Sequence, residues 1–160
     1  MSRAKAALGS AVFLVIAPGV VAGVIPWWLT GWNTAHELWL PLRLAGAAVI
    51  VAGAGVLLHA FASFVLEGVG TPAPVAPTER LVVGGLYRYV RNPMYLAVVA
   101  TILGQAAVLG RLNLVVYAAA IWLLFAAFVH WYEEPHLTRE YGERYERYRK
   151  AVPGWLPRRK

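Results

Sequence analysis

The chain contains no cysteine and few charged residues. Without cysteine it can form neither disulfides nor thiolate zinc sites, and it has no cysteine nucleophile. Charged residues make up only 14% of its 160 residues, against roughly a quarter in soluble domains. Hydrophobic residues make up 59%. This composition is typical of a membrane protein, and the length predicts one domain over residues 1–160.

Four apolar segments account for most of this hydrophobicity, at residues 8–29, 42–66, 94–109 and 112–131. A helix that spans a bilayer needs roughly 20 apolar residues, and each segment, including the short third one, is predicted to cross the membrane. We therefore expect an all-α, polytopic membrane protein with four transmembrane helices. Pro93 suits the first turn of the third helix, where its missing N–H would have had no partner.

The polar tail over residues 133–151 predicts one cytoplasmic amphipathic helix. Acidic residues precede basic residues by four positions, a spacing that supports a helix, in the pairs Glu140–Arg144, Glu143–Arg147 and Glu146–Lys150. Tyrosines on another face of this helix are expected to pack against the membrane surface or the preceding loop. These are Tyr141, Tyr145 and Tyr148.

The formal net charge of +7 is interpreted as membrane orientation, not as nucleic-acid binding. Thirteen basic residues fall on one predicted face, and only Arg43 and Arg111 fall on the other. By the positive-inside rule both termini are cytoplasmic, at a bacterial or archaeal cytoplasmic membrane whose anionic lipids the basic residues contact. A cleavable signal peptide is the alternative for the first segment, but its apolar run continues through Trp27 and Trp28, beyond a short signal core.

Two polar clusters bracket the last two apolar segments. The first covers residues 85–95, and the second is the acidic pair Glu133-Glu134. Because the intervening segments form a hairpin, joined at residues 110–113, both clusters return to the same membrane face. Two polar sets that are distant in the sequence are therefore predicted to meet beside lipid and form a site.

The two clusters have complementary chemistry. Arg91, Asn92 and Tyr95 lie at the start of a predicted helix, where backbone N–H groups favour anionic ligand groups. Glu133 and Glu134 favour cationic groups. S-adenosylmethionine carries both kinds of group, and tyrosine rings would also attract its sulfonium. The alternative is an ion-pair cluster that only orients the hairpin.

A longer pattern of residues contains both clusters. It comprises Leu81, Val82, Gly85, Leu86, Tyr87, residues 91–95, Glu133, Glu134, Tyr141, Gly142, Tyr145, Tyr148, Val152 and Pro153. Over residues 78–157 this pattern resembles the isoprenylcysteine carboxyl methyltransferases and the related phospholipid methyltransferases. The resemblance implies that S-adenosylmethionine is the cofactor and that it binds on the cytoplasmic side.

The resemblance also implies which residues hold this cofactor. Glu133 would bind its amino group, and Glu134 would support that contact. The other residues that the resemblance places around the cofactor are Glu79, Arg80, Leu81, Val82, Tyr87, Asn92, Pro93, Met94 and Tyr95. No metal is expected to take part.

The chain departs from the family pattern at two positions. Asn92 stands where many members have His, and Asn can donate a hydrogen bond but cannot act as a base. Val129 stands where eukaryotic carboxyl methyltransferases place a substrate-binding Arg, which argues against a prenylcysteine carboxylate as the acceptor. An amine acceptor would need a base, and His130 is the predicted catalytic residue for that step. His59, inside the second segment, is a candidate substrate contact, with a hydrogen bond to a neighbouring helix as the alternative.

These observations predict a membrane methyltransferase that acts on a lipid or another lipophilic or amphiphilic molecule. Methyl transfer from a sulfonium is an in-line displacement that depends on alignment and on exclusion of water. Two alternatives remain at this stage. One is a non-enzymatic membrane scaffold or transport subunit, and the other is a methyltransferase for a small thiol or metabolite.

Overall fold

The computed structural model describes residues 3–68 and 80–157. Every regular element within these residues is helical, as predicted. The α-helices are α1 (Arg3–Gly19), α2 (Ile25–Thr30), α3 (Leu40–Ser63), α4 (Pro93–Leu109), α5 (Leu112–Phe128), α6 (Glu134–Tyr141) and α7 (Glu143–Ala151). Three π-helical turns, η1 (Val20–Val24), η2 (Phe64–Gly68) and η4 (Val129–Glu133), and one 3₁₀ turn, η3 (Gly85–Arg88), complete the described part.

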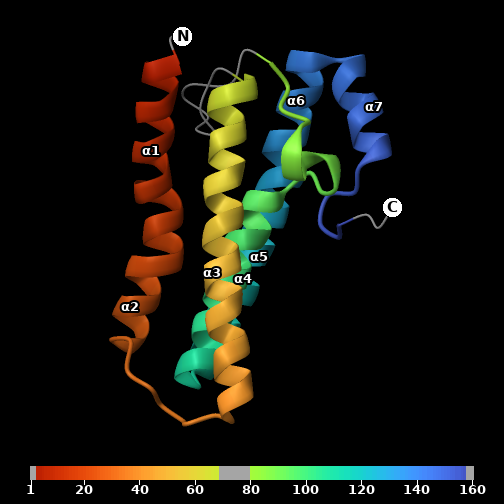
Figure 1. Cartoon of the computed structure of the whole chain (residues 1–160). Helices are drawn as coiled ribbons and strands as arrows, with labels where there is room; N and C mark the ends of the chain where they lie inside the picture. The colour runs from red at the N-terminus through yellow and green to blue at the C-terminus, as the bar shows by residue number, and fades with distance from the viewer. Residues whose placement is uncertain (1–2, 69–79, 158–160) are drawn as a thin grey trace.

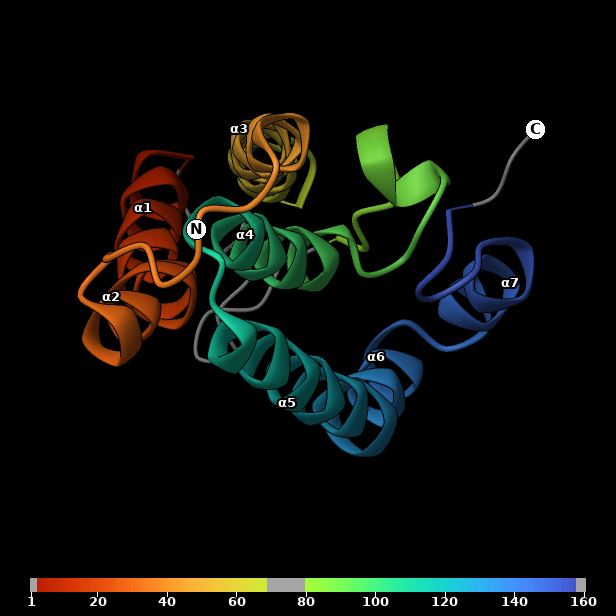
Figure 2. The same ribbon diagram turned by 90° about the horizontal axis from the view of Figure 1, so that it is seen from below.

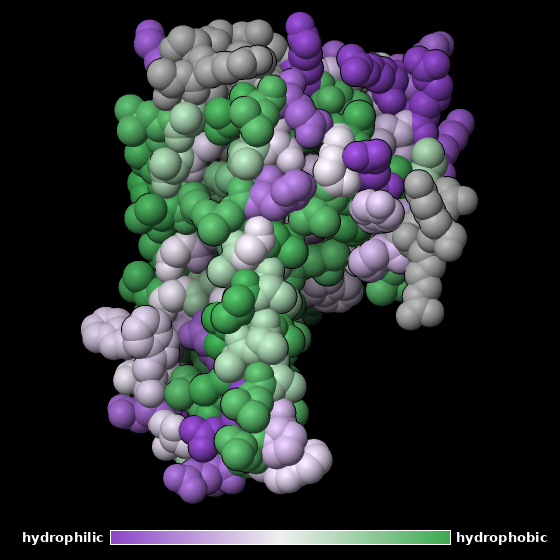
Figure 3. Space-filling model, viewed as in Figure 1, coloured by the Kyte–Doolittle hydropathy of each residue, from purple (hydrophilic) through white to green (hydrophobic). Residues whose placement is uncertain are grey.

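All four predicted apolar segments are helices. Three continuous helical stretches are long and apolar enough to cross a membrane, namely Ala7–Thr30, Leu40–Glu67 and Leu112–Tyr141. The fourth, α4, is apolar but has only 17 residues. Figure 3 shows hydrophobic surface over the middle of the molecule and hydrophilic residues gathered near its two ends. The structure therefore confirms an all-helical protein with apolar helices of membrane-spanning character, and the count of four spans stays a prediction.

The helices are arranged so that the two polar clusters share one end of the molecule. The start of α1, the end of α3, and helices α6 and α7 all lie toward that end in Figure 1, and the turn between α4 and α5 lies toward the other. Seen along the bundle, α4 is placed between α3 and α5 (Figure 2). The hairpin thus returns to the end of the molecule at which it starts, as its predicted geometry requires.

Glycines allow α3 and α4 to approach closely. A Cβ built on Gly46 would lie 2.7 Å from the carbonyl oxygen of Gly104, and a Cβ built on Gly104 would lie 2.7 Å from the carbonyl oxygen of Gly46. Small residues at a helix interface are the usual means of close packing in membranes. The buried side chains of Leu57, Phe61 and Ile102 extend this contact into the core. Helix α4, which begins the site, is held in place by this packing.

Gly104→Ala is expected to destabilise the protein by about 1–3 kcal/mol, because the added methyl group overpacks the contact with α3. Gly55→Ala is the matched control, since a Cβ there meets no heavy atom of the described residues within 4 Å. Both variants gain about the same helix propensity, so the difference between their thermal unfolding temperatures in detergent isolates the packing. Equal unfolding temperatures would show that the close approach contributes nothing to stability.

Two of the π-helical turns precede a proline by the same spacing. Turn η1 ends at Val24 before Pro26, and η4 ends at Glu133 before Pro135. Proline has no N–H, and its ring crowds the carbonyl four residues earlier, so the regular helical ladder cannot continue. The wider π turn accommodates this break. It also leaves carbonyl groups that need other partners.

The carbonyl groups of η1 are satisfied by the neighbouring helices. The Gln105 side chain on α4 donates to the Ala22 oxygen at 2.6 Å, and the Tyr117 hydroxyl on α5 donates to the Val21 oxygen at 2.7 Å. An unsatisfied carbonyl in a lipid environment is costly. These two hydrogen bonds therefore join the N-terminal helical stretch to the helices that carry the site.

The tail differs from the prediction of a single helix. It consists of α6 and α7, separated at Gly142 with φ 54° and ψ −132°, a conformation that favours glycine. The predicted pair of Glu140 with Arg144 would cross this break. Glu146 lies 3.7 Å from Arg149, three residues on, and accepts a hydrogen bond from Thr138 of α6. The break folds α7 back beside α6 instead of extending the helix.

Candidate functional site

A pocket lies at the end of the bundle that carries α6 and α7. Its walls are Phe64 of η2, the segment from Leu81 to Tyr95, the stretch that runs from the end of α5 into α6, and one face of α7. Nine of the residues predicted to surround a cofactor line this pocket. They are Leu81, Val82, Tyr87, Asn92, Pro93, Met94, Tyr95, Glu133 and Glu134. The structure therefore brings the two predicted clusters together.

The two other residues predicted to surround the cofactor are Glu79 and Arg80. Arg80 is exposed and does not line the pocket, and Glu79 lies outside the described residues. His59 is also exposed, and its Nε2 lies close to Gly85, where a Cβ would meet it at 2.5 Å. His59 thus contacts the outside of the loop that forms the pocket wall.

His130 does not occupy the position predicted for a catalytic base. It is exposed, and its ring contacts Trp131 with centroids 5.7 Å apart, whereas Val129 and Glu133 line the pocket. Residues four apart share a helix face, and the residue that follows Val129 is turned away from it. The sequence spacing of three residues between His130 and Glu133 therefore did not place the imidazole in the pocket.

Glu133 faces the pocket and is held by a phenol. The Tyr95 hydroxyl donates to its Oε2 at 2.7 Å, and the Tyr95 ring packs against Phe125 with centroids 4.6 Å apart. Within the described part of the chain, no arginine or lysine lies within ion-pair distance of Glu133. A carboxylate that has one neutral hydrogen-bond donor and no ion-pair partner can bind a cationic ligand group.

Pro135 determines the direction in which the Glu133 side chain points. The π turn η4, which ends at Glu133, changes the direction in which the two acidic side chains leave the helix. Glu133 points to Tyr95 on α4, and Glu134 points to the loop before α4 and to α7. Two neighbouring glutamates thus receive different partners.

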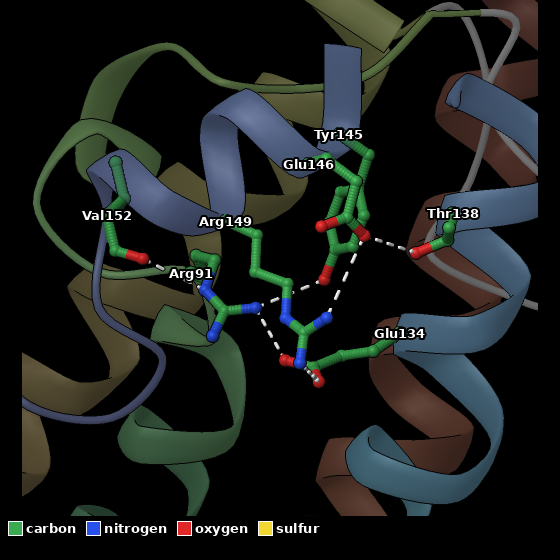
Figure 4. Close-up of polar contacts among 7 residues, drawn as sticks. All are labelled: Arg91, Glu134, Thr138, Tyr145, Glu146, Arg149 and Val152. Carbon is green, nitrogen blue, oxygen red and sulfur yellow. Dashed lines mark hydrogen bonds and ion pairs between the residues drawn. The ribbon is translucent and has the colours of Figure 1, made fainter. Parts of the chain in front are cut away.

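Glu134 is neutralised by two arginines (Figure 4). Arg91 Nη1 donates to its Oε1 at 2.5 Å, and Arg149 Nη2 lies 3.4 Å from its Oε2. The side chains of Arg91 and Glu134 are only 14% and 13% exposed, so this pair is screened little by solvent. Glu134 therefore acts as an anchor between the loop, α6 and α7.

Arg91 connects the loop before α4 to α6, to α7 and to the residue that follows α7. Its Nη1 also donates to the Tyr145 hydroxyl at 3.1 Å, and its Nε donates to the Val152 carbonyl at 3.0 Å. Burial lowers the pKa of Arg91, but the hydrogen bonds to Glu134 and Tyr145 outweigh burial and leave the pKa above its usual value. The guanidinium is thus permanently charged and committed to protein partners.

Asn92 presents an unsatisfied amide at the start of α4. Its side chain is buried at 6% exposure and lines the pocket, and its Nδ2 has no hydrogen-bond partner within residues 3–68 and 80–157. A buried donor without a partner costs free energy unless a ligand satisfies it. Pro93 follows as the first residue of the helix, so the donor lies next to the positive end of α4. This amide fits an anionic ligand group.

The wall opposite α5 is a loop fixed by several unusual contacts. Gly85 has a positive φ of 53°, and the Gly84 N–H donates to the Glu67 carboxylate at 3.1 Å. Tyr87 is buried, which raises the pKa of its hydroxyl well above the usual value. The Tyr148 hydroxyl donates to the Tyr87 carbonyl at 2.7 Å. The glycine pair therefore has a structural role in shaping the pocket wall.

Two of the three tail tyrosines pack against the preceding loop, which is one of the two alternatives predicted for them. Tyr145 is buried and bonded to Arg91, and Tyr148 is bonded to the loop at Tyr87. Both also line the pocket. Sequence reasoning did not identify several other lining residues, whose apolar or aromatic character in a membrane protein carries no signal of a site. They are Phe64, Phe128, Tyr132 and Leu137.

Comparisons with known proteins agree with this site. A family model described as Phospholipid methyltransferase matches residues 42–144, which is more than half of the chain. A protein of Schizosaccharomyces pombe (strain 972), described as Protein-S-isoprenylcysteine O-methyltransferase, is 35% identical over 78 residues. That match covers 48% of this chain and 33% of the yeast protein. The similarity to this relative thus extends over a third of its length.

Proposed function

The chain belongs to the phospholipid methyltransferase family, and from this premise we propose that it transfers a methyl group from S-adenosylmethionine to a lipophilic acceptor. The family and the apolar helices make it an integral membrane methyltransferase. The proposal adds the cofactor, the cytoplasmic location of the site and the class of acceptor.

The observation that carries the proposal is the pair of unmatched polar groups in one pocket. Among the described residues, Glu133 offers a carboxylate without an ion-pair partner, and Asn92 offers a buried amide donor without an acceptor. S-adenosylmethionine carries an amino group for the first and a carboxylate for the second. The rings of Tyr87 and Tyr95 line the same pocket and favour a sulfonium. The residues present therefore fit the cofactor.

The remaining residues have positioning roles in this proposal. Tyr95 orients the Glu133 carboxylate, and Glu134 holds Arg91, which in turn holds α7 against the loop. S-adenosylmethionine supplies an electrophilic methyl group when it is bound. The protein contributes alignment of the acceptor and exclusion of water, which are the main requirements of a displacement at a sulfonium.

The lining of the pocket favours a lipophilic acceptor without a carboxylate. Phe64, Phe128 and Val129 provide apolar surface near the membrane. Among the described residues, Arg91 is the only arginine that lines the pocket, and it already forms an ion pair with Glu134. A carboxylate acceptor would find no unpaired arginine or lysine among the described lining residues, and it would lie beside Glu133. We therefore propose a lipid or lipid-like acceptor whose nucleophile is uncharged when it reacts.

The proposed topology has four transmembrane helices with the site at the cytoplasmic face. Helix α4 has 17 residues, which is at the lower end of the range of about 17–25 that can span a bilayer. Eight of the basic residues lie in the tail after α5, and this bias supports a cytoplasmic location for the pocket and the tail. The polar cofactor would enter from the cytoplasm and the acceptor from the bilayer.

Binding of S-adenosylmethionine to the purified protein in lipid nanodiscs tests the proposal directly. We expect saturable binding by calorimetry, displaced by S-adenosylhomocysteine but not by adenosine alone. Incubation with cofactor labelled in its methyl group and a membrane lipid extract should then give label that partitions into organic solvent. Absence of binding to folded protein would indicate a membrane scaffold, and label found only in aqueous or volatile products would indicate a small thiol or metabolite as acceptor.

A further inference from the structure

The four residues after α7 form a strap that returns to the start of α4. We define this C-terminal strap as residues 152–155. Its backbone pairs with the loop before α4, since the Arg91 N–H donates to the Pro153 oxygen at 2.9 Å and the Asn92 N–H donates to the Gly154 oxygen at 3.2 Å. The strap lies beyond residues 42–144, which the family model matches.

The strap also lies directly against the side chains of these two residues. The Val152 carbonyl accepts from Arg91 Nε at 3.0 Å. A Cβ built on Gly154 would lie 3.1 Å from Arg91 Nη2 and 3.5 Å from Asn92 Nδ2. A larger residue at position 154 would therefore press on the guanidinium and the amide. The strap therefore packs against the side chains of both Arg91 and Asn92.

Trp155 extends the strap to a third residue of the site. Its ring lies 6.4 Å from the ring of Tyr95 and 5.9 Å, edge to face, from that of Trp122 on α5. Phe125 contacts the Tyr95 ring as well. The phenol that donates to Glu133 is thus held by aromatic contacts from α5 and from the strap.

We propose that Trp155 is a positioning residue for the cofactor site, acting through Tyr95 on the Glu133 carboxylate. This inference rests on the proposed function. Helix α4 supplies Tyr95, and η4 supplies Glu133. The Trp155 ring contacts Tyr95 of α4 and Trp122 of α5, the helix that leads into η4. Without the indole, the phenol gains rotational freedom and donates to Glu133 for a smaller fraction of the time. The affinity for the cofactor then falls although no residue that contacts it has changed.

The test is a double-mutant cycle of Trp155→Ala and Tyr95→Phe, with the Kd for S-adenosylmethionine and the unfolding temperature measured for each variant. Trp155→Ala is expected to weaken binding by about 3- to 10-fold, the effect of one aromatic pair. Trp155→Phe should restore most of the affinity. In the Tyr95→Phe background, which lacks the hydroxyl that Glu133 accepts from, Trp155→Ala should have no further effect on Kd.

Trp131→Ala is the matched control, because Trp131 is 76% exposed, lies on η4 and is not part of the pocket wall. It should leave Kd unchanged. If Trp155→Ala lowers the unfolding temperature without changing Kd, or if its effect adds fully to that of Tyr95→Phe, the positioning role is wrong and the proposed function stands. If Trp155→Ala fails to fold, Trp155→Leu decides by the same two criteria. Wild-type protein that does not bind the cofactor overturns the proposed function and this inference together.

Discussion

Glu133→Gln is expected to weaken binding of S-adenosylmethionine by about 1.5–3 kcal/mol, the contribution of a charge-assisted hydrogen bond. This corresponds to about ten- to 150-fold in Kd. The reason is that the Glu133 carboxylate has Tyr95 as its hydrogen-bond partner and has no ion-pair partner among the described residues. Glutamine keeps the size of the side chain, removes its charge and replaces one acceptor oxygen with an NH2 donor. Calorimetry on the purified protein measures the change.

The same substitution should leave the free protein as stable as before, or slightly more stable. An unpaired carboxylate in a poorly solvated pocket costs free energy, and the neutral amide removes that cost. Glu143→Gln is the matched control, since Glu143 is an exposed acid of α7 outside the pocket wall. A variant at position 133 that loses stability but binds the cofactor normally would make Glu133 a scaffold residue and not a ligand-binding residue.

Arg91→Met is expected to have the largest effect on stability. It leaves the Glu134 carboxylate, whose side chain is 13% exposed, without its shorter ion pair. Breaking a buried ion pair costs about 3–5 kcal/mol, and we expect about 3 kcal/mol because Arg149 still lies 3.4 Å from Glu134. The variant also loses the hydrogen bonds to Tyr145 and Val152. Thermal unfolding in detergent micelles gives the change.

Arg88→Met removes the same charge from the same loop and serves as the control. Arg88 is exposed, so its loss should change stability by less than about 0.5 kcal/mol. Arg91→Lys keeps the charge but not the planar group that reaches three partners, and it should recover only part of the loss. Equal stability of the Arg88 and Arg91 variants would mean that the ion pair does not hold the loop, α6 and α7 together.

The helices and the meeting of the two polar clusters were predictable from local sequence. Apolar runs become helices in a membrane because only a helix satisfies its own backbone there. Pro93 marked the start of α4, and Gly110, with φ 61°, ends it. Since α4 and α5 form a hairpin, Tyr95 and Glu133 had to approach each other. The spacing of the apolar segments and the geometry of the hairpin were therefore sufficient to predict that the two polar clusters meet.

Other features depended on contacts that no local pattern contains. The tail was predicted as one helix because its charge pairs fit helical spacing, yet it breaks at Gly142, where α7 turns back to reach the loop. His130 was predicted near the pocket because it is close to Glu133 in sequence, and the helix turns it outward. Charge spacing and proximity in sequence do not define which face of a helix meets a neighbour.

The sequence by itself determined that this is a membrane protein of apolar helices with two polar clusters at one end. Only the tertiary structure decided that Glu134 is neutralised by Arg91 and Arg149, and that Glu133 is left to a phenol. The two glutamates are chemically identical and adjacent. They differ because Pro135 imposes a π turn that sends them in different directions, and because the C-terminal segment returns about 60 residues along the chain to Arg91.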